Sequence, residues 1–565
     1  MFGTTRIIKF MALAILIFPL VEIASASTYY VAANGSDSNA GTSTSTPWLH
    51  APGMPNCSGV CASTTINAGD SIILRGGDTW HFGSSSSPSA GGTWSLSRSG
   101  SSGSPVYIGV DTSWYSGSSF ARPVLSGDNP LFNGSWPSSC AYDYGSPLHS
   151  LATFGSYVTF DNIEVTGVCW SGNLGGGNPA FVQVGSNSLV EHSYCHGWTE
   201  LKSATDNYNC FQVGTNSTYD GDVFDGSDAV HFAAGSNCAF DTAAPCATGS
   251  GIYWHAATIE HCVFRYLHNM VVINDSVTSA HDNLFEYLEF PPTSTMVSGQ
   301  HPDVYMVYTG STSGAHNTFY NNTVRHTYVS EMIYLQASAG EATYIFNNIF
   351  YDNQNWGGGN TAPMGCIQLN AGNSGTQTLY VFNNTFDMDT DDATGGGCKI
   401  EFWGTSGGNS NGAPWNGTTY AANNHVIGLT TFASLFSNAG SGATNSVNDL
   451  GGNIAQATAT ARSQGYTQST TPVGDIITSS SGATYRAGTN QSSYCSTFSS
   501  DSALCSSTGG GPLEQAADGG QIANFPALPI ESRGSAWDAG AYYFGGGTTT
   551  GAAPNPPTGL SATVN

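Results

Sequence analysis

The sequence predicts an all-β chain wound into a right-handed parallel β-helix with irregular loop insertions, and three observations indicate this fold. A short phrase returns along the chain, as Ile-Phe-Asn-Asn-Ile-Phe at 345–350 and Val-Phe-Asn-Asn-Thr-Phe at 381–386. Its copies lie 21 to 40 residues apart, a variable period typical of stacked units that carry inserted loops. The chain also has 71 Gly but only 12 Lys and Arg, as turn-rich all-β proteins require.

One polar position recurs in each copy of the phrase, and we expect it to form a buried ladder. Its expected members are Ser193, Asp222, Cys262, Asn283, Asn317, Asn348 and Asn384. Coils stacked about 4.8 Å apart complete one another's backbone hydrogen bonds and share one core. Small polar side chains in register could then bond to the coils above and below, which satisfies groups that are costly to bury. The alternative is a β-sandwich in which Asn-Asn marks hairpin turns, but its strands would recur every 8–12 residues or so.

The first residues are typical of a secretory signal. Arg6 and Lys9 precede a largely apolar run at 11–23, and Ala-Ser-Ala at 24–26 fits a cleavage site. Residues 1–26 are therefore predicted to be removed, which leaves a secreted, extracellular protein. An uncleaved membrane anchor is the alternative, although the apolar run is short for a bilayer span.

Thirteen cysteines in a secreted chain predict disulfides. Short separations favour Cys57–Cys61, Cys238–Cys246 and Cys495–Cys505, and Cys366 and Cys398 could face each other across the stack. The odd count leaves one thiol over unless it bridges two chains. Cys262 is the candidate for a buried free cysteine because it occupies a ladder position.

The net charge of −26 constrains the partners. Nucleic acid and anionic membranes are poor partners for such a surface, so neither nucleic-acid binding nor membrane insertion is expected. A polyuronate would be repelled as well, unless bound cations reversed the local field. We expect a monomer whose partner is a polysaccharide or a cell-surface glycan.

Both ends of the repeat region carry further motifs. Residues 28–48 read TYYVAANGSDSNAGTSTSTPW, residues 69–78 read GDSIILRGGD, and residues 533–542 read RGSAWDAGAY. These segments resemble the cap, first coil and closing segment of secreted bacterial parallel β-helix proteins of the pectate-lyase-like superfamily. With the ladder, the resemblance covers roughly 28–545. It implies the fold but no single reaction, because the superfamily includes lyases, glycoside hydrolases, esterases, adhesins and tailspikes.

The expected domain layout is a β-helix at 27–545 followed by a flexible, Gly- and Thr-rich linker at 546–555. Residues 556–565 resemble the first strand of a fibronectin type III domain that is cut short. Ten residues cannot form that domain alone.

Strand alternation is expected to turn a polar and aromatic set outward from one sheet. This set includes Gln212, His231, Met306, Tyr308, Tyr334, Gln336, Gln368, Glu401 and Trp403. Aromatic faces beside amides suit sugar rings, so the candidate substrate-binding residues are His231, His301, Tyr334, Gln368, Glu401 and Trp403. Either histidine could relay a proton. The alternative is an ordinary sheet face covered by loops.

A column of acids, two residues before each pair of core residues, provides the candidate catalytic groups Asp303, Glu331 and Asp228. Asp303 and Glu331 would lie in adjacent coils about 5 Å apart, where each carboxylate raises the proton affinity of the other. Such a pair suits general acid and base chemistry of glycoside hydrolysis. Asp228 could supply a wider separation. The alternative is that these acids cap turns or bind a structural cation.

The resulting hypothesis is a glycoside hydrolase acting on a polysaccharide, with no required cofactor. One alternative is a non-catalytic glycan-binding or adhesion protein, and another is a calcium-dependent polysaccharide lyase. Bound Ca²⁺ is possible because Asp220, Asp222, Asp225 and Asp228 form a dense acidic run, although the run matches no EF-hand loop and no metal ligands are assigned. A lyase would also need a basic residue, and few Lys and Arg are present.

Overall fold

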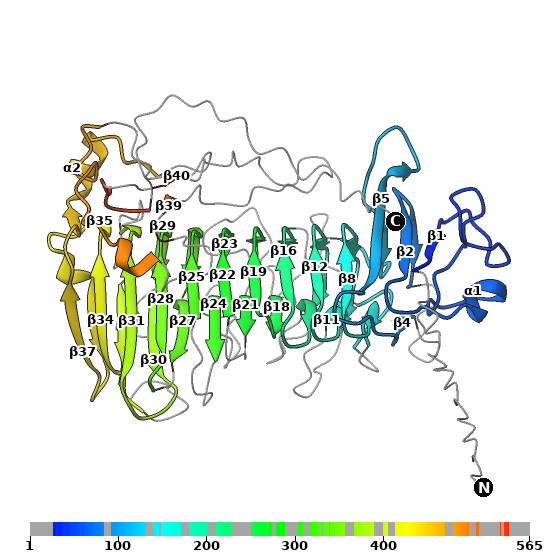
Figure 1. Ribbon diagram of the computed structural model, residues 1–565, viewed down its shortest axis with the longest axis horizontal. Helices are drawn as coiled ribbons and strands as arrows, with labels where there is room; N and C mark the ends of the chain where they lie inside the picture. Colours follow the sequence, from blue (N-terminus) through cyan, green and yellow to red (C-terminus); the bar gives the residue numbers. More distant parts are fainter. Residues whose placement is uncertain are drawn as a thin grey trace, which may run out of the picture.

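The computed structural model describes most of the chain between residues 26 and 541. The described residues are 26–83, 92–131, 139–145, 149–170, 180–200, 209–227, 250–267, 269–273, 278–288, 303–308, 317–329, 331–337, 339–355, 367–388, 399–404, 413–468, 480–495, 504, 506–507, 531–532 and 536–541. They form an elongated stack of strands, with the N-terminal coils at one end and the C-terminal coils at the other (Figure 1).

Three long sheets, called sheets A, B and C, make up the stack, and every strand pairing within them is parallel. Sheet A contains β1 (Thr28–Val31), β2 (Ser71–Gly76), β5 (Val106–Tyr115), β8 (Val158–Asp161), β12 (Leu189–Glu191), β16 (Thr218–Asp220), β19 (Thr258–Glu260), β22 (Thr278–His281), β25 (Asn317–Tyr320), β28 (Ala342–Phe346), β31 (Gln377–Phe382), β34 (Asn416–Ala422) and β37 (Thr444–Asp449). Sheet B contains β3 (Thr79–His81), β6 (Val124–Ser126), β9 (Glu164–Thr166), β13 (Tyr194–His196), β17 (Val223–Asp225), β20 (Val263–Arg265), β23 (Leu284–Leu288), β26 (Thr323–Val329), β29 (Ile349–Asn355), β32 (Thr385–Asp387), β35 (His425–Ile427) and β38 (Ile454–Gln456). Sheet C contains β4 (Trp94–Leu96), β7 (Ala152–Phe154), β11 (Ala180–Val184), β15 (Asn209–Val213), β18 (Ser250–Trp254), β21 (Asn269–Ile273), β24 (Asp303–Tyr308), β27 (Glu331–Ala337), β30 (Ile367–Ala371), β33 (Ile400–Trp403) and β36 (Phe436–Ala439).

Little other regular structure is present in the described ranges. The helices are α1 (Gly59–Ser63), α2 (Thr458–Ser463) and two 3₁₀ turns at Phe432–Leu435 and Ser492–Tyr494. The short strands β10 (Cys169–Trp170) and β14 (Thr199–Glu200) pair in parallel, and β39 (Ser506–Ser507) and β40 (Glu531–Ser532) pair antiparallel. No described helix has the length and apolar character that a bilayer span requires.

The chain visits the three sheets in a fixed order, as in β16, β17 and β18 before it returns to sheet A at β19. Each strand pairs with its counterpart one coil away, so the backbone bonds of every coil are completed by its neighbours. The right-handed parallel β-helix predicted from the sequence is therefore confirmed. The separation of consecutive strands along the chain varies: β17 ends at Asp225 and β18 begins at Ser250, whereas β20 ends at Arg265 and β21 begins at Asn269.

The core repeats with the coils because inward residues stack in register. In sheet B, Phe224 stacks on Phe264 with ring centroids 4.6 Å apart, and Phe264 stacks on Phe285 at 5.0 Å. All three rings are buried. Identical side chains in successive coils thus fill one continuous column, which is why the aromatic residue of the phrase recurs.

The polar ladder exists, with one correction to its membership. Asn348 Nδ2 donates to Asn384 Oδ1 at 3.0 Å and to the Phe319 carbonyl at 2.8 Å. In the coil before, the ladder residue is Asn322, whose Nδ2 donates to Asn348 Oδ1 at 3.2 Å. The predicted member Asn317 is wrong, because it lies at the start of β25 and pairs with Thr343.

The ladder also runs further than predicted. Asn384 donates to Asn424 at 3.1 Å, and Asn424 donates to Asn453 at 2.9 Å. At the other end, the Ser193 backbone N–H donates to Asp222 Oδ1 at 2.8 Å. The ladder therefore satisfies polar groups along most of the described coils.

The described cysteines form three disulfides: Cys57–Cys61, Cys140–Cys169 and Cys195–Cys210. The first was predicted, and Cys262 is a buried free thiol as predicted. The other two were missed because each joins residues brought together by coiling. Disulfides are typical of proteins that fold in an oxidising compartment.

Several predictions concern residues outside the described ranges. They are the signal segment up to residue 25, the linker at 546–555, the fibronectin-like segment at 556–565, and Cys238, Cys246, Cys366, Cys398 and Cys505. The domain limits inferred from these segments remain predictions.

Candidate active site on sheet A

The predicted catalytic acids Asp303 and Glu331 lie directly opposite each other in the pairing of β24 with β27, which confirms that they occupy adjacent coils. Asp303 is fully buried. It shares strand parity with Tyr305, whose ring belongs to the central core. Asp303 thus lies on the inward side of its strand and not on the outward face. Asp228 lies outside the described residues, as do His231 and His301.

The predicted binding residues of sheet C lie together but are covered. Tyr334, Gln368 and Glu401 form one register column across β27, β30 and β33. They are between 2 and 8% exposed, and Trp403, two residues after Glu401, is 6% exposed. The Trp403 Nε1–H donates to Glu401 Oε2 at 2.9 Å. Tyr334 packs with Tyr253 and Met306 in a satellite cluster. This arrangement matches the alternative of a sheet face covered by other parts of the chain.

The acidic run near Asp222 does not converge on one point. Asp220 faces outward from sheet A, Asp222 belongs to the buried ladder, and Asp225 bonds to Arg265 on sheet B at 3.0 Å. Within the described residues, no group of three or more His, Cys, Asp and Glu side chains is placed to hold a metal ion.

An open groove of about 520 Å³ lies instead on the outward face of sheet A. Its walls include Tyr157, Asn187 and Asn216 at the corners where the chain enters successive strands. These three residues have φ angles of 55°, 58° and 58°, which form the same left-handed corner in each coil. The repeated corner aligns the coils, so their outward side chains form one continuous floor.

The groove ends at two carboxylates in neighbouring coils. Asp220 and Glu260 both line the groove and lie opposite each other in the pairing of β16 with β19. They belong to a longer column that continues through Glu191 and Asp161 in one direction and His281 in the other. We call this column the acidic row. Strands that pair in a sheet are about 4.8 Å apart, so successive carboxyl groups lie close together.

Histidines from the next position of the chain contact two members of the row. The strand ends turn through His192 and His261 in the left-handed region, with φ of 52° and 54°. This turn brings His192 Nδ1 to 3.1 Å from Asp161 Oδ1 and His261 Nδ1 to 2.8 Å from Asp220 Oδ1. These side chains are between 17 and 34% exposed, so the row is accessible to ligands.

Glu260 has a further histidine neighbour. His281 Nε2 lies 3.4 Å from Glu260 Oε2, and its Nδ1 lies 2.9 Å from Asp282 Oδ2. The second aspartate holds the imidazole between the two acids. Asp282 also ends its strand in the left-handed region, so the same corner that places His261 places this partner.

The surroundings shift the pKa values of Glu260 and His261. Burial raises the pKa of the Glu260 carboxyl, and the charges of Asp220 and Asp282 add to this against the lowering effect of His281 and His261. Burial opposes protonation of His261, but its hydrogen bond to Asp220 and the nearby acids raise its pKa to about 9. At neutral pH, His261 is therefore a cation beside Asp220. Glu260 holds its proton more tightly than an ordinary glutamate does, which is what a general acid requires.

The sequence carries a local signal for this row beside the ladder positions. The two residues before each ladder position read Glu191-His192, Asp220-Gly221, Glu260-His261 and His281-Asp282. In the first three of these coils, an acid ends the strand and is followed by a residue that tolerates a left-handed turn. Its significance depends on the corner geometry, because the turn decides whether the histidine reaches the acid.

The two arginines of the repeats are held by carboxylates on sheet B. Arg265 Nε donates to Asp225 at 3.0 Å, and Arg325 donates to Glu286 at 2.7 Å and to the Tyr351 hydroxyl at 2.9 Å. Burial lowers the pKa of both guanidinium groups, but the neighbouring carboxylates outweigh it and raise both. Neither arginine is suited to act as the base that a lyase requires.

Comparison with known proteins gives distant structural neighbours alone. No protein-family model matches the chain, and no curated protein matches it either. Among solved structures, the GH136 lacto-N-biosidase from Eubacterium ramulus has 12% identity and a TM-score of 0.36, covering 76% of this chain and 68% of that chain. Pectate lyase Pel9A has 15% identity and a TM-score of 0.36, covering 83% and 94%. A rhamnogalacturonan lyase has 12% identity and a TM-score of 0.32, covering 75% and 87%.

Proposed function

We propose that the protein is a secreted glycoside hydrolase that cleaves a neutral glycan in the sheet A groove. The observation that carries the proposal is the in-register pair Asp220 and Glu260, which both line an open groove, with the pKa of Glu260 raised by burial. A spacing near that of paired strands, about 4.8 Å, is close to the 5–5.5 Å or so that suits retaining hydrolysis.

The roles follow from the contacts. Glu260 donates its proton to the glycosidic oxygen as the bond to the leaving sugar breaks. Asp220 attacks the anomeric carbon with Oδ2, because Oδ1 accepts the hydrogen bond from His261. The hydrogen bond from His261 fixes the orientation of the Asp220 side chain. Glu260, now a carboxylate, takes a proton from water as the water releases the sugar from Asp220, which restores both groups.

The charge distribution supports a neutral substrate. A uronate would meet the net charge of −26 and the acidic row itself. The groove floor offers the hydroxyls of Thr159 and Thr218 and the apolar side chain of Leu189 between them. Sugar rings present hydroxyls and C–H faces together, so such a floor complements them.

A glycan panel assayed for new reducing ends and for unsaturated-uronide absorbance tests the reaction class. We expect reducing ends from a neutral glycan, with no unsaturated product. Asp220→Asn and Glu260→Gln should each lower turnover by about 100-fold or more. Asp449→Asn, on an exposed residue at the far end of sheet A, is the matched control and should retain normal turnover.

Asp303 and Glu331 remain the proposed alternative pair, so Asp303→Asn and Glu331→Gln belong in the same assay. Loss of turnover in those variants, with normal turnover in Asp220→Asn, would move the reaction to sheet C. Glycan binding without turnover across the panel would instead favour a binding or adhesion module. Unsaturated product would favour the lyase alternative.

A further inference from the structure

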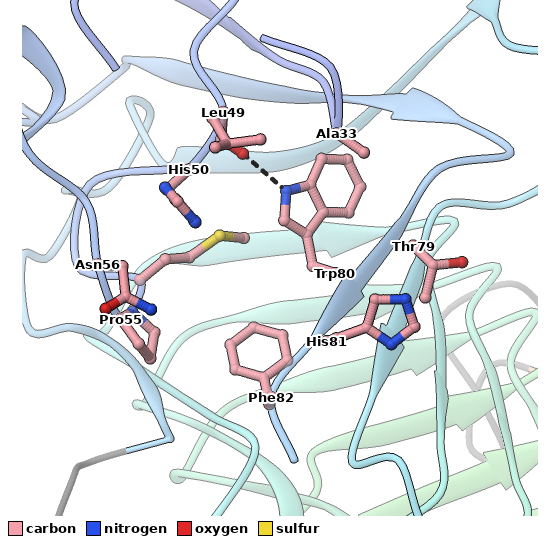
Figure 2. Close-up of a pocket in the computed structure, with 10 residues that line it drawn as sticks. Ala33, Leu49, His50, Pro55, Asn56, Thr79, Trp80, His81 and Phe82 are labelled. Atoms are coloured by element: carbon pink, nitrogen blue, oxygen red, sulfur yellow. Dashed lines mark hydrogen bonds between the residues drawn. The ribbon is translucent and has the colours of Figure 1, made fainter. Parts of the chain in front are cut away.

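A second cavity lies among the N-terminal coils, apart from the acidic row. It has a volume of about 310 Å³ and is lined by residues of β3 and of the loop before α1 (Figure 2). Small-molecule pockets begin at about 300 Å³ and combine apolar walls with a few polar groups that fix orientation. The dimensions therefore suit a small ligand.

The walls of the cavity are apolar and held in place. Trp80, Phe82 and Met54 are at most 5% exposed and belong to the central core. The Trp80 Nε1–H donates to the Leu49 carbonyl at 2.9 Å, so the indole is fixed and its polar atom is already used. What the indole offers to the cavity is an aromatic surface.

Two imidazoles supply the polar groups at separate positions around these walls. Figure 2 shows His50 and His81 apart, with Trp80 and Phe82 between them. His50 Nδ1 lies 2.9 Å from Asp37 Oδ2, and His81 Nδ1 lies 2.6 Å from Asp128 Oδ1. In both rings, the carboxylate engages Nδ1. The Nε2 atoms have no hydrogen-bond partner among the described residues.

The carboxylates behind the imidazoles are fully engaged by the protein. Asp37 also accepts from the backbone N–H groups of His50 and Ser58, at 2.9 and 3.1 Å. Burial opposes ionisation of Asp37, but these hydrogen bonds lower its pKa overall. The contact with Asp37 occupies Nδ1 of His50 and leaves Nε2 for a ligand. Asp128 likewise accepts from the Gly83 N–H at 2.9 Å.

We propose that this cavity binds a neutral sugar unit, as a glycan-binding subsite separate from the proposed catalytic groove. The aromatic and thioether walls would contact the C–H face of the ring, and the two Nε2 atoms would form hydrogen bonds with hydroxyls on opposite edges. An anionic ligand is disfavoured because carboxylates lie behind both histidines in a chain of charge −26. A cation is disfavoured because those carboxylates are already paired.

Two substitutions test the Nε2 atoms by removing them while the contact made by Nδ1 is kept. His81→Asn and His50→Asn keep a donor near the position of Nδ1, so the bond to Asp128 or Asp37 can persist while Nε2 is lost. The His81 side chain is 63% exposed, so its replacement is expected to leave the fold intact. The control is Asp449→Asn, on an exposed residue at the far end of sheet A, away from this cavity and from the acidic row.

The measurement is binding of neutral mono-, di- and trisaccharides of glucose, galactose, xylose and N-acetylglucosamine to the full chain. Saturation-transfer NMR would find the ligand and calorimetry would give its Kd. We expect at least about tenfold weaker binding in His81→Asn and in His50→Asn, with a change below about twofold in Asp449→Asn. If His50→Asn does not fold, His81→Asn decides the result alone.

Three outcomes would overturn the proposal. They are unchanged affinity in His81→Asn, no binding of any sugar to the folded protein, and stoichiometric Zn²⁺ binding that His81→Asn abolishes. The last would assign the imidazoles to a metal. The assay reads binding and not turnover, so it stays informative if the groove proves inactive. Conversely, Glu260→Gln should lower turnover without changing sugar affinity in this cavity.

Discussion

At the scale of single residues, Asp222 shows what the ladder demands of its members. Its Oδ1 accepts the Ser193 N–H, but its Oδ2 is buried without a hydrogen-bond partner in the described structure. Burial raises the pKa of this carboxyl well above its usual value, with smaller contributions from neighbouring acids. An asparagine at the equivalent position, Asn283, donates its amide to the Ile259 carbonyl at 2.9 Å. An aspartate therefore leaves a ladder bond unmade.

Asp222→Asn should stabilise the protein at neutral pH. A carboxyl whose folded pKa is raised binds more protons in the folded than in the unfolded state, so wild-type stability falls as the pH rises above 3.8, the ordinary value. The asparagine removes this loss and should raise the free energy of unfolding by about 1–3 kcal/mol at pH 7. Thermal melts at pH 3.5 and pH 7 check it. The gain should be small at the lower pH, and a less stable variant at pH 7 would mean that Asp222 is an ionised, paired group.

Asn348→Leu tests the ladder itself. Leucine removes the amide that bonds to Phe319 and Asn384, and it leaves their buried partner groups unsatisfied. The expected cost is about 1–3 kcal/mol of unfolding free energy, measured by urea denaturation. Asn317→Leu is the comparison, because Asn317 lies outside the ladder. An unchanged midpoint in Asn348→Leu would show that the ladder contributes little to stability.

At the scale of elements, sheet B is crossed by a row of alternating charges. Asp225, Arg265, Glu286 and Arg325 occupy the same position in β17, β20, β23 and β26. All four side chains are at most 13% exposed. A buried ion pair offsets its own desolvation only where its partners are in place, so this row depends on correct stacking of four coils.

Arg325→Met should therefore be costly. The change leaves buried Glu286 with Arg265 as its remaining cation at 3.9 Å. The expected loss is about 3–5 kcal/mol of unfolding free energy. The double variant Glu286→Gln with Arg325→Met removes the unpaired charge and should recover part of that loss. No difference between the single and double variants would show that the charge itself is not the cause.

The outward aromatics of sheet C give a further test at this scale. Tyr334 and Trp403 are buried and contact the satellite cluster and Glu401, respectively. Replacing both with Ala should lower the melting temperature markedly, because truncating buried aromatics leaves cavities. Calorimetry of the double variant gives its melting temperature and its affinity for the glycan found in the panel. A normal melting temperature with weakened glycan affinity would return these residues to a binding role.

At the scale of the whole molecule, the repeat phrase was enough to predict the β-helix, because the period and the buried polar position follow from coil stacking alone. The error at Asn317 arose because asparagines at 317, 321 and 322 lie within one copy of the phrase, and only the strand register separates them. The acidic row was harder to foresee. Its acids are ordinary strand-end residues in the sequence, and they become a site only when left-handed corners bring histidines from the next position beside them.

Trapping the covalent bond between the sugar and Asp220 tests the central proposal most directly. The glycan that the panel identifies can be converted to a fluorinated glycoside that stalls the sugar on the nucleophile of a retaining hydrolase. Mass spectrometry of the digested protein would then locate the added sugar. The proposed roles predict that it lies on the peptide containing Asp220, and that Asp220→Asn abolishes it. A sugar attached to Asp303 or Glu331, or turnover that inverts the anomeric centre without any attachment, would contradict the assignment of Asp220 as the nucleophile.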